Sequence, residues 1–165
     1  MAGLQLSLYK KYCIDSSALI DVWDENEYPS SVYLNIRSKF EVGFQNGLFI
    51  APMEVFRELK KQQDDLSKLV TQHKSHFIEV DSSQSVYIKQ IYTKYTAMSL
   101  LMKTEADPFV VALARAQDLT VVCNEKRQIP PSLNRPKIPN LCDEFGVKCL
   151  SLNEFFQEVG WKFSG

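Results

Sequence analysis

Four acidic residues lie at widely separated points of the 165-residue chain, each beside an apolar segment. Asp15 directly follows "YCI", and Glu125 comes two residues after the apolar run "LTVVC". Glu58 and Asp107 lie in segments with the apolar spacing of helices. The chain lacks the His and Cys spacings of a zinc site. Carboxylates are hard oxygen ligands, and without His or Cys beside them they suit Mg²⁺ or Mn²⁺. If folding gathers these carboxylates, their mutual repulsion requires such a cation.

Each acidic residue also has a simpler interpretation. Asp15 and Asp107 both directly precede a predicted helix or begin it, where Asp is a favoured N-cap. Glu54 and Glu58 are one turn apart and fit a solvent-exposed helix face. Glu125 fits an ordinary polar turn. Helix caps and exposed helix faces are not expected to gather at one end of a sheet. If the four acidic residues do gather there, a functional site is the better interpretation.

Short apolar segments alternate with helical ones along the chain. The predicted strands are 9–14, 48–51, 76–80, 119–123 and 147–150. The predicted helices are 16–23, 31–45, 52–62, one beginning at Asp64 or Asp65, 81–101, 107–117, 141–146 and 151–160. This alternation predicts an α/β fold in a single domain over residues 1–165, with a central parallel sheet of about five strands between helix layers. In such sheets the site lies beyond the carboxyl ends of the strands, where the four acidic residues are expected.

Composition is that of an ordinary globular protein. Hydrophobic residues make up 45% and charged residues 24%, and no apolar stretch approaches the roughly 20 residues of a membrane span. The start "MAGLQLSLYKKY" lacks the features of a signal peptide, so we expect a cytoplasmic protein that does not enter a membrane. The four cysteines show no zinc-like spacing and are expected to be free thiols. A net charge of −1 argues against a large nonspecific nucleic-acid surface but is compatible with a local basic rim.

Four short motifs occur in a fixed order along the chain. "IDSSALI" places Asp15 before two hydroxyl residues, "PMEVFREL" carries Glu58 before a leucine, "EADPFVVALARA" opens a helix of small residues at Asp107, and "VVCNEK" ends a strand with an acid. In this order and spacing, the chain resembles the PIN-domain family of metal-dependent nucleases, especially its small toxin-like bacterial branch. The resemblance implies a three-layer PIN-like α/β/α sandwich and hydrolysis of RNA phosphodiester bonds.

The fourth motif departs from the family pattern. Cys123 stands where Thr is usual, and Glu125 stands where Asp is more common, so the role of Glu125 is the least secure. The following stretch, "KIPNLC", is similar to a less-studied PIN subgroup with a Lys-Ile-Pro-Asn-x-Cys sequence.

The resemblance implies an endoribonuclease in which Asp15, Glu58, Asp107 and Glu125 are catalytic. Asp15 and Asp107 would hold Mg²⁺ or Mn²⁺, which lowers the pKa of a bound water for in-line attack on the phosphate. Glu58 would bind the ion directly or orient its water, and Glu125 would assist from farther away. The neighbouring acid Asp21 and the nearby Asp24 lie outside this quartet and serve as comparison residues.

Further residues are expected to support the ligands or to bind RNA. Ser16, Ser17 and Glu54 are expected to contact the ligands or their waters. Basic residues in the loop after Glu125 and shortly before Asp107 are expected to grip the RNA backbone: Lys103, Lys126, Arg127, Arg135 and Lys137. The alternative for this loop is a solvated segment without a ligand.

Two functions remain open on the sequence alone. The first is the toxin of a toxin–antitoxin pair that cleaves RNA. The second is a catalytically weak PIN scaffold that binds a protein or RNA partner without cleavage, which the departures at Cys123 and Glu125 favour. An antitoxin protein and a homodimer are the assemblies that the resemblance suggests, although the residues themselves specify neither.

Overall fold

The computed structural model describes residues 11–62, 65–96, 98 and 105–163. Its strands are β1 (Tyr12–Ile14), β2 (Phe49–Pro52), β3 (Phe77–Ile78), β4 (Thr120–Val122) and β5 (Cys149–Leu150). Its helices are α2 (Ser16–Val22), α3 (Ile36–Gln45), α4 (Met53–Lys60), α5 (Asp65–Gln72), the 3₁₀ turn η1 (Lys74–His76), α6 (Ser82–Lys94), α8 (Asp107–Gln117), α9 (Ile138–Phe145) and α10 (Leu152–Val159). Within these described residues, every helix is too short or too polar to span a lipid bilayer.

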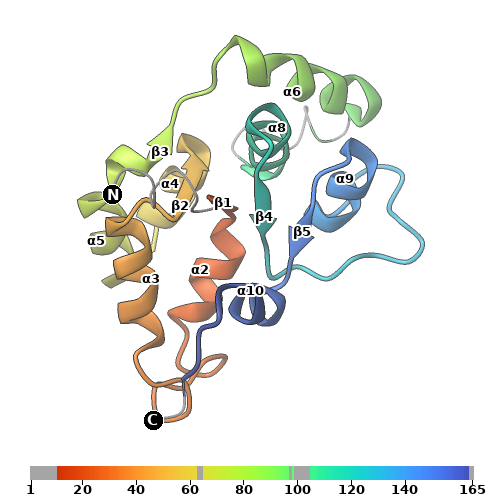
Figure 1. Cartoon of the computed structure of the whole chain (residues 1–165). Coiled ribbons are helices and arrows are strands. Elements are labelled where there is room, and N and C mark those ends of the chain that lie inside the picture. The colour runs from red at the N-terminus through yellow and green to blue at the C-terminus, as the bar shows by residue number, and fades with distance from the viewer. Residues whose placement is uncertain (1–10, 63–64, 97, 99–104, 164–165) are drawn as a thin grey trace.

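The strands form one parallel sheet in the order β3-β2-β1-β4-β5 (Figure 1). The chain begins in the centre of the sheet, adds β2 and β3 on one side, and then crosses to add β4 and β5 on the other. The winding therefore reverses between β1 and β4, which pair through Cys13 with Val121 and Ile14 with Val122. In sheets of this kind, a ligand crevice forms outside the carboxyl ends of the strands at the reversal point.

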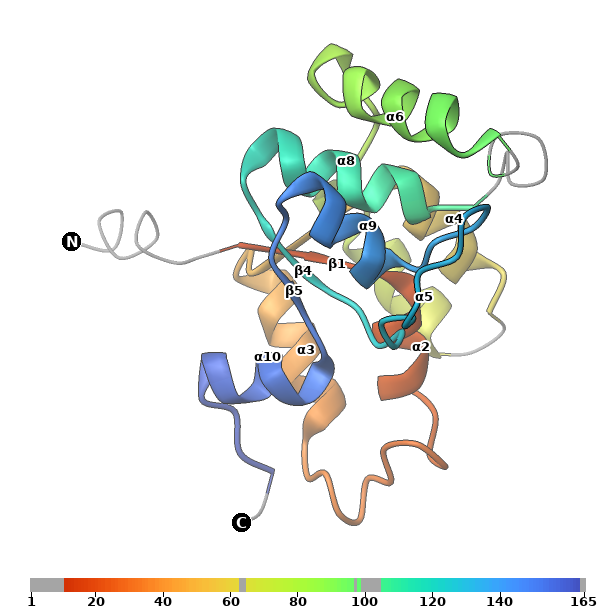
Figure 2. The same cartoon turned by 90° about the vertical axis from the view of Figure 1, so that its right-hand side faces the viewer.

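Helices cover both faces of this sheet (Figures 1 and 2). On one face, α8 packs against β1, β2 and β4, while α6 and α9 both pack against α8. On the opposite face, α3 packs against β2 and α10 packs against β5. Because α8 leads directly into β4, it runs opposite to the strands and begins at their carboxyl edge. The predicted layered α/β fold with five parallel strands is confirmed.

An aromatic cluster joins the sheet to α3 and α10. Phe40, Phe44, Phe49 and Phe155 are fully buried. The Phe40 ring stacks on Phe49 with centroids 5.3 Å apart, and Trp161 meets Phe40 edge-on at 5.1 Å. Each such pair contributes about 0.5–1.5 kcal/mol beyond the burial of its surface. The cluster therefore fixes α3 and α10 against the sheet face opposite to α8.

The helix predicted over 31–45 begins later than expected, at Ile36. Asn35 adopts a left-handed backbone conformation with φ 60°, which cannot continue a right-handed helix. Val32 is 62% exposed and Leu34 is 42% exposed, so the apolar residues in the first part of the predicted range do not reach the core. The predicted start of this helix was wrong because apolar spacing alone does not reveal the break at Asn35.

The helix predicted over 81–101 is observed as α6, which ends at Lys94. Asp81 caps this helix by accepting hydrogen bonds from the backbone N–H groups of Ser83 and Gln84. Val86 fits the apolar spacing of the predicted helix but is 55% exposed. Position 97 and residues 99–101 lie outside the described residues.

Other boundaries also differ. The strand predicted over 76–80 is shortened to Phe77–Ile78, which lies beside β2 at the edge of the sheet, and the strand predicted over 147–150 is shortened to Cys149–Leu150. The short helix predicted over 141–146 begins earlier, at Ile138, because Pro139 suits the first turn of a helix. The first strand begins at Tyr12, so Lys11 precedes it, and positions 9 and 10 lie outside the described residues. Position 64, where one predicted helix could begin, also lies outside them, and α5 is observed from Asp65.

Candidate active site

Asp15 connects the end of β1 to the start of α2. Its Oδ2 atom accepts hydrogen bonds from the Ser17 backbone N–H at 3.3 Å and from the Ser17 hydroxyl at 2.7 Å, so Asp15 caps α2. The residue is 2% exposed, and its Oδ1 atom has no hydrogen-bond partner within the described part of the chain. A buried carboxylate oxygen without a donor is costly unless a cation or a water meets it. Asp15 is therefore a helix cap that also presents an oxygen atom suited to a cation.

Asp107 is the first residue of α8 but does not cap it. The cap position belongs to Ala106, which makes no side-chain capping bond. The capping interpretation therefore holds for Asp15 and fails for Asp107. The Asp107 carboxylate instead lines a cavity at the carboxyl edge of the sheet.

The pKa values of both aspartates are raised. Burial is the largest cause for Asp15, whose pKa rises from 3.8 to about 6 although its hydrogen bonds favour the ionised form. Burial is again the largest cause for Asp107, and the charges of Asp15, Glu125, Glu105 and Glu58 help to raise its pKa to about 8. These effects mean that the carboxylates lie within electrostatic reach of one another. Bringing a cation among them would favour their ionised forms.

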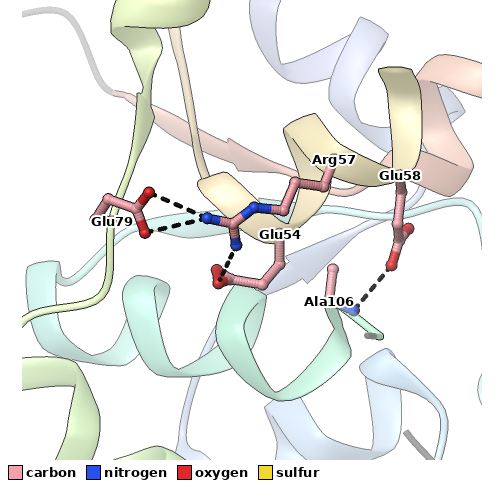
Figure 3. Close-up of polar contacts among 5 residues, drawn as sticks. All are labelled: Glu54, Arg57, Glu58, Glu79 and Ala106. Atoms are coloured by element: carbon pink, nitrogen blue, oxygen red, sulfur yellow. Dashed lines mark hydrogen bonds and ion pairs between the residues drawn. The ribbon is translucent and has the colours of Figure 1, made fainter. Parts of the chain in front are cut away.

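Glu58 extends from α4 toward both α2 and α8. Its Oε2 atom accepts a hydrogen bond from the Ser16 hydroxyl at 2.5 Å. Its Oε1 atom accepts one from the Ala106 backbone N–H at 2.8 Å, the bond drawn in Figure 3. Both carboxylate oxygens of Glu58 therefore already have a donor.

Glu54 turns away from Glu58 although the two lie one turn apart on α4 (Figure 3). Arg57 donates to Glu54 at 3.2 Å and to Glu79, beyond β3, at 3.1 Å. Glu54 is absent from the residues that line the cavity. The expectation that Glu54 supports the ligands was based on shared helix periodicity, whereas the structure places its carboxylate beside Arg57.

Cys123 follows β4 and contacts the first aspartate. Its thiol donates toward the Asp15 Oδ2 atom at 3.8 Å. A hydrogen bond with Cys149, burial and the charge of Asp15 all raise the pKa of the Cys123 thiol, which therefore stays protonated. Within the described residues, this thiol is the weak donor that stands where the family resemblance leads us to expect a hydroxyl group. All four cysteines are free, as the sequence predicted.

Asn124 forms a contact that sequence reasoning missed. Its backbone N–H donates to the Ser17 hydroxyl oxygen at 3.2 Å, and its side-chain amide donates to Asp21 at 2.6 Å. Asp21 is thereby connected through Asn124 and Ser17 to Asp15, so it is a poor comparison residue. Asp24 remains suitable, because its carboxylate accepts an N–H within an exposed turn.

Glu125 is held at the start of α9. Its Oε2 atom accepts a hydrogen bond from the Ile138 backbone N–H at 3.4 Å. The longer side chain is therefore anchored on the side of the cavity formed by α9 and the loop before it.

A cavity of about 720 Å³ lies where these segments meet. Its lining includes eight residues that the sequence singled out: Asp15, Ser16, Ser17, Glu58, Asp107, Glu125, Arg135 and Lys137. The structure thus brings the four acidic residues together. Lys126 and Arg127 do not line the cavity, and Arg127 pairs with Asp143 at 2.6 Å. Lys103 lies outside the described residues.

Two charged lining residues were missed from the sequence. Glu105, two residues before Asp107, pairs with Arg135 at 3.1 Å and joins the loop after β4 to the segment before α8. Its place in the motif "EADP", beside Asp107, could have identified it from the sequence. Lys61 lines the cavity from the end of α4, and only the observed end of that helix places it there.

A hard divalent cation fits these residues in part. Over the described ranges, no three carboxylate, imidazole or thiol groups are gathered tightly enough to hold a metal ion as they stand. Mg²⁺ nevertheless needs only one or two protein carboxylates, because it keeps several waters. The unpartnered Asp15 Oδ1 atom and the half-buried Asp107 carboxylate line one cavity and meet that smaller requirement.

Comparisons with known proteins bear on the fold. The sequence model of a family described as a domain of unknown function (DUF4411) matches residues 12–163. A chain in the crystal structure of VapBC2 from Rickettsia felis bound to a DNA fragment from their promoter is similar with a TM-score of 0.50 and 15% identity, covering 85% of the present chain and 97% of that chain. The search of curated proteins gave no match. The structural likeness supports a PIN-like fold, as the sequence predicted.

Proposed function

Because the chain belongs to the DUF4411 family and has a PIN-like fold, we propose that it is a metal-dependent endoribonuclease, the toxin of a toxin–antitoxin pair. The observation that carries this proposal is the gathering of Asp15, Glu58, Asp107 and Glu125 in one cavity at the reversal point of the sheet. The raised pKa values of Asp15 and Asp107 support it, since perturbed acids in a cleft are typical of functional sites.

Asp15 and Asp107 would hold Mg²⁺ or Mn²⁺. When bound, the ion would supply Lewis acidity, lowering the pKa of a water and offsetting charge on the phosphate. Ser17 fixes the Asp15 carboxylate through Oδ2 and leaves Oδ1 for the ion. Glu125, anchored by the Ile138 N–H, would face the substrate from the opposite wall and help to orient water.

Cations on two sides of the cavity would hold the RNA backbone. Arg135 and Lys137 line it from the loop after β4, and Lys61 lines it from the end of α4. Phosphate contacts of this kind supply affinity and register without reading sequence. A strand of RNA would therefore pass between Lys61 and Arg135, with one phosphate beside the carboxylates.

The partner of such a toxin would be an antitoxin protein. The matched structure is that of VapBC2 bound to a DNA fragment from their promoter. The proposal for the present chain is narrower: a protein that occludes the acidic cavity and so prevents RNA cleavage.

Cleavage of labelled single-stranded RNA tests the activity. With Mn²⁺ we expect cleavage by the wild type, and a loss of at least about 100-fold in Asp15→Asn and Asp107→Asn, more than the loss typical of a merely supporting residue. Asp24→Asn is the control and should cleave normally, because its carboxylate serves an exposed turn. Wild-type rates in both aspartate variants, or undiminished cleavage in a chelator, would overturn the proposal.

Two observations support a second function, binding without cleavage. The described residues hold no preformed group of three metal-binding side chains, and Cys123 offers only a weak donor beside Asp15. The chain would then bind RNA or a protein without cutting it. Binding of RNA in a chelator that equals binding in Mn²⁺, with no turnover in either, would favour this function.

A further inference from the structure

The two hydrogen bonds of Glu58 fall on the residues directly next to the two aspartates. Ser16, which donates to Oε2, follows Asp15 in the sequence. Ala106, which donates to Oε1, precedes Asp107. One side chain on α4 thus connects the start of α2 to the start of α8, the two helix ends that carry Asp15 and Asp107. Figure 3 shows the second of these contacts, from Glu58 to Ala106.

We propose that Glu58 is a positioning residue that clamps Asp15 and Asp107 at their working separation, and that it does not bind the metal ion. This role rests on the proposed function, because holding Asp15 and Asp107 at a fixed separation affects catalysis only if the two aspartates share an ion. It replaces the ligand role that the family resemblance implied for Glu58.

The position of Glu58 is itself fixed by the packing of α4. Val55 and Leu59 on this helix are fully buried, so α4 cannot rotate without removing them from the core. Arg57, which also pairs with Glu54 within the same helix, ties α4 to Glu79 beyond β3. Glu58 therefore projects from a rigid support toward α2 and α8.

The contact with α8 supplies what that helix lacks. Ala106 at the cap position has no side-chain acceptor, and the first N–H groups of a helix have no partner within the helix. A carboxylate that accepts the N–H of the cap residue normally comes from the third residue of the same helix. Here Glu58 provides that carboxylate from another helix, where its negative charge is also favoured by the helix dipole.

The contact with α2 is short and charge-assisted. The Ser16 hydroxyl lies 2.5 Å from Oε2, and such bonds to a carboxylate are roughly twice as strong as neutral ones. Each carboxylate oxygen can accept a second partner, so an ion that bound Glu58 would share an oxygen with the Ser16 or Ala106 donor. Within the described chain, the Asp15 Oδ1 atom has no such partner, so the ion would meet Asp15 first.

The test compares Glu58→Gln with Glu58→Ala. A glutamine retains an oxygen that accepts the Ala106 N–H and gains an amide that donates to the Ser16 hydroxyl oxygen, whereas alanine removes both contacts. If Glu58 is a clamp, the dissociation constant for Mn²⁺, measured by electron paramagnetic resonance, changes by less than about threefold in Glu58→Gln and by at least about tenfold in Glu58→Ala.

A direct ligand gives a different pattern. Replacing a ligating carboxylate by a neutral amide would then weaken Mn²⁺ binding at least about tenfold in both Glu58 variants, which would overturn the proposal. Glu54→Gln is the matched control one turn earlier on α4, with its carboxylate outside the cavity, and should bind Mn²⁺ like the wild type.

A second readout needs no metal. Hydrogen exchange at the Ala106 amide, measured in a chelator, should be protected in the wild type and in Glu58→Gln and at least about tenfold faster in Glu58→Ala. Equal exchange in all three proteins would refute the clamp even if Mn²⁺ binds. If the wild type binds no Mn²⁺, the proposed function fails, and the exchange rates still decide whether the clamp exists.

Discussion

Asp107→Asn is expected to stabilise the metal-free protein. In the folded state the pKa of Asp107 is raised from 3.8 to about 8, mainly by burial and then by the neighbouring carboxylates. Between these two values the folded protein holds a proton that the unfolded chain releases, so stability falls as the pH rises from about 4 to about 8. Asparagine carries no such proton, and its variant should lack this part of the pH dependence.

The size of the effect follows from the width of that window. Each pH unit contributes at most about 1.4 kcal/mol, so Asp107 accounts for at most roughly 4 kcal/mol between about pH 5 and about pH 8. Asp15 titrates in the same window, with a pKa of about 6, and shares the repulsion. For the single substitution we therefore expect a gain at pH 8 that exceeds the gain at pH 5 by about 2 kcal/mol.

Urea unfolding in a chelator at both pH values measures this difference. Asp118→Asn is the control, because Asp118 lies exposed at the other end of α8, in a left-handed conformation that asparagine also tolerates. With Mn²⁺ at about 100 times its dissociation constant, the wild type should gain about 2.7 kcal/mol and Asp107→Asn much less. A variant no more stable than the wild type at pH 8, or one with the full response to Mn²⁺, would refute the reasoning.

Three further predictions concern the core and the RNA contact. Gln84 is fully buried with neither amide atom partnered in the described chain, so Gln84→Met should raise the free energy of unfolding by about 1 kcal/mol in urea titrations; a decrease would show that the amide is satisfied. A Cβ atom on Gly43 would lie 2.6 Å from a carbon of the Phe49 ring, so Gly43→Ala should cost about 1–3 kcal/mol in thermal unfolding, and unchanged stability would contradict the close packing of α3 on β2. Arg135→Gln should weaken RNA binding and reduce by about 0.7 the slope of the logarithm of the binding constant against the logarithm of the salt concentration. Arg127→Gln is the control and should change neither quantity, because the Arg127 guanidinium is paired outside the cavity; equal effects of the two substitutions would place the RNA elsewhere.

The convergence of the acidic residues could be predicted from the sequence because it depends only on topology. Asp15 and Glu125 follow strands of one parallel sheet, and the carboxyl ends of parallel strands share an edge. Asp107 precedes a strand, but it opens the helix that returns along the sheet, so it reaches the same edge. Helix periodicity and strand order are sufficient for such conclusions.

The contacts between side chains could not be predicted in the same way. Glu54 and Glu58 lie one turn apart on α4, yet the Glu54 carboxylate binds Arg57 and does not reach the cavity. The pair of Glu105 and Arg135 depends on the path of an irregular loop, which no apolar period encodes. Apolar spacing locates an element to within a few residues, whereas tertiary packing determines which partner a long charged side chain contacts.

The position of Mn²⁺ in a crystal of the wild-type protein, found by its anomalous scattering, tests the central claim most directly. We expect an ion within about 2.5 Å of the Asp15 Oδ1 atom and of one Asp107 carboxylate oxygen, with waters completing its coordination. An ion bound elsewhere, or none at millimolar Mn²⁺ in a well-ordered crystal, would contradict a metal-dependent nuclease built on these two aspartates.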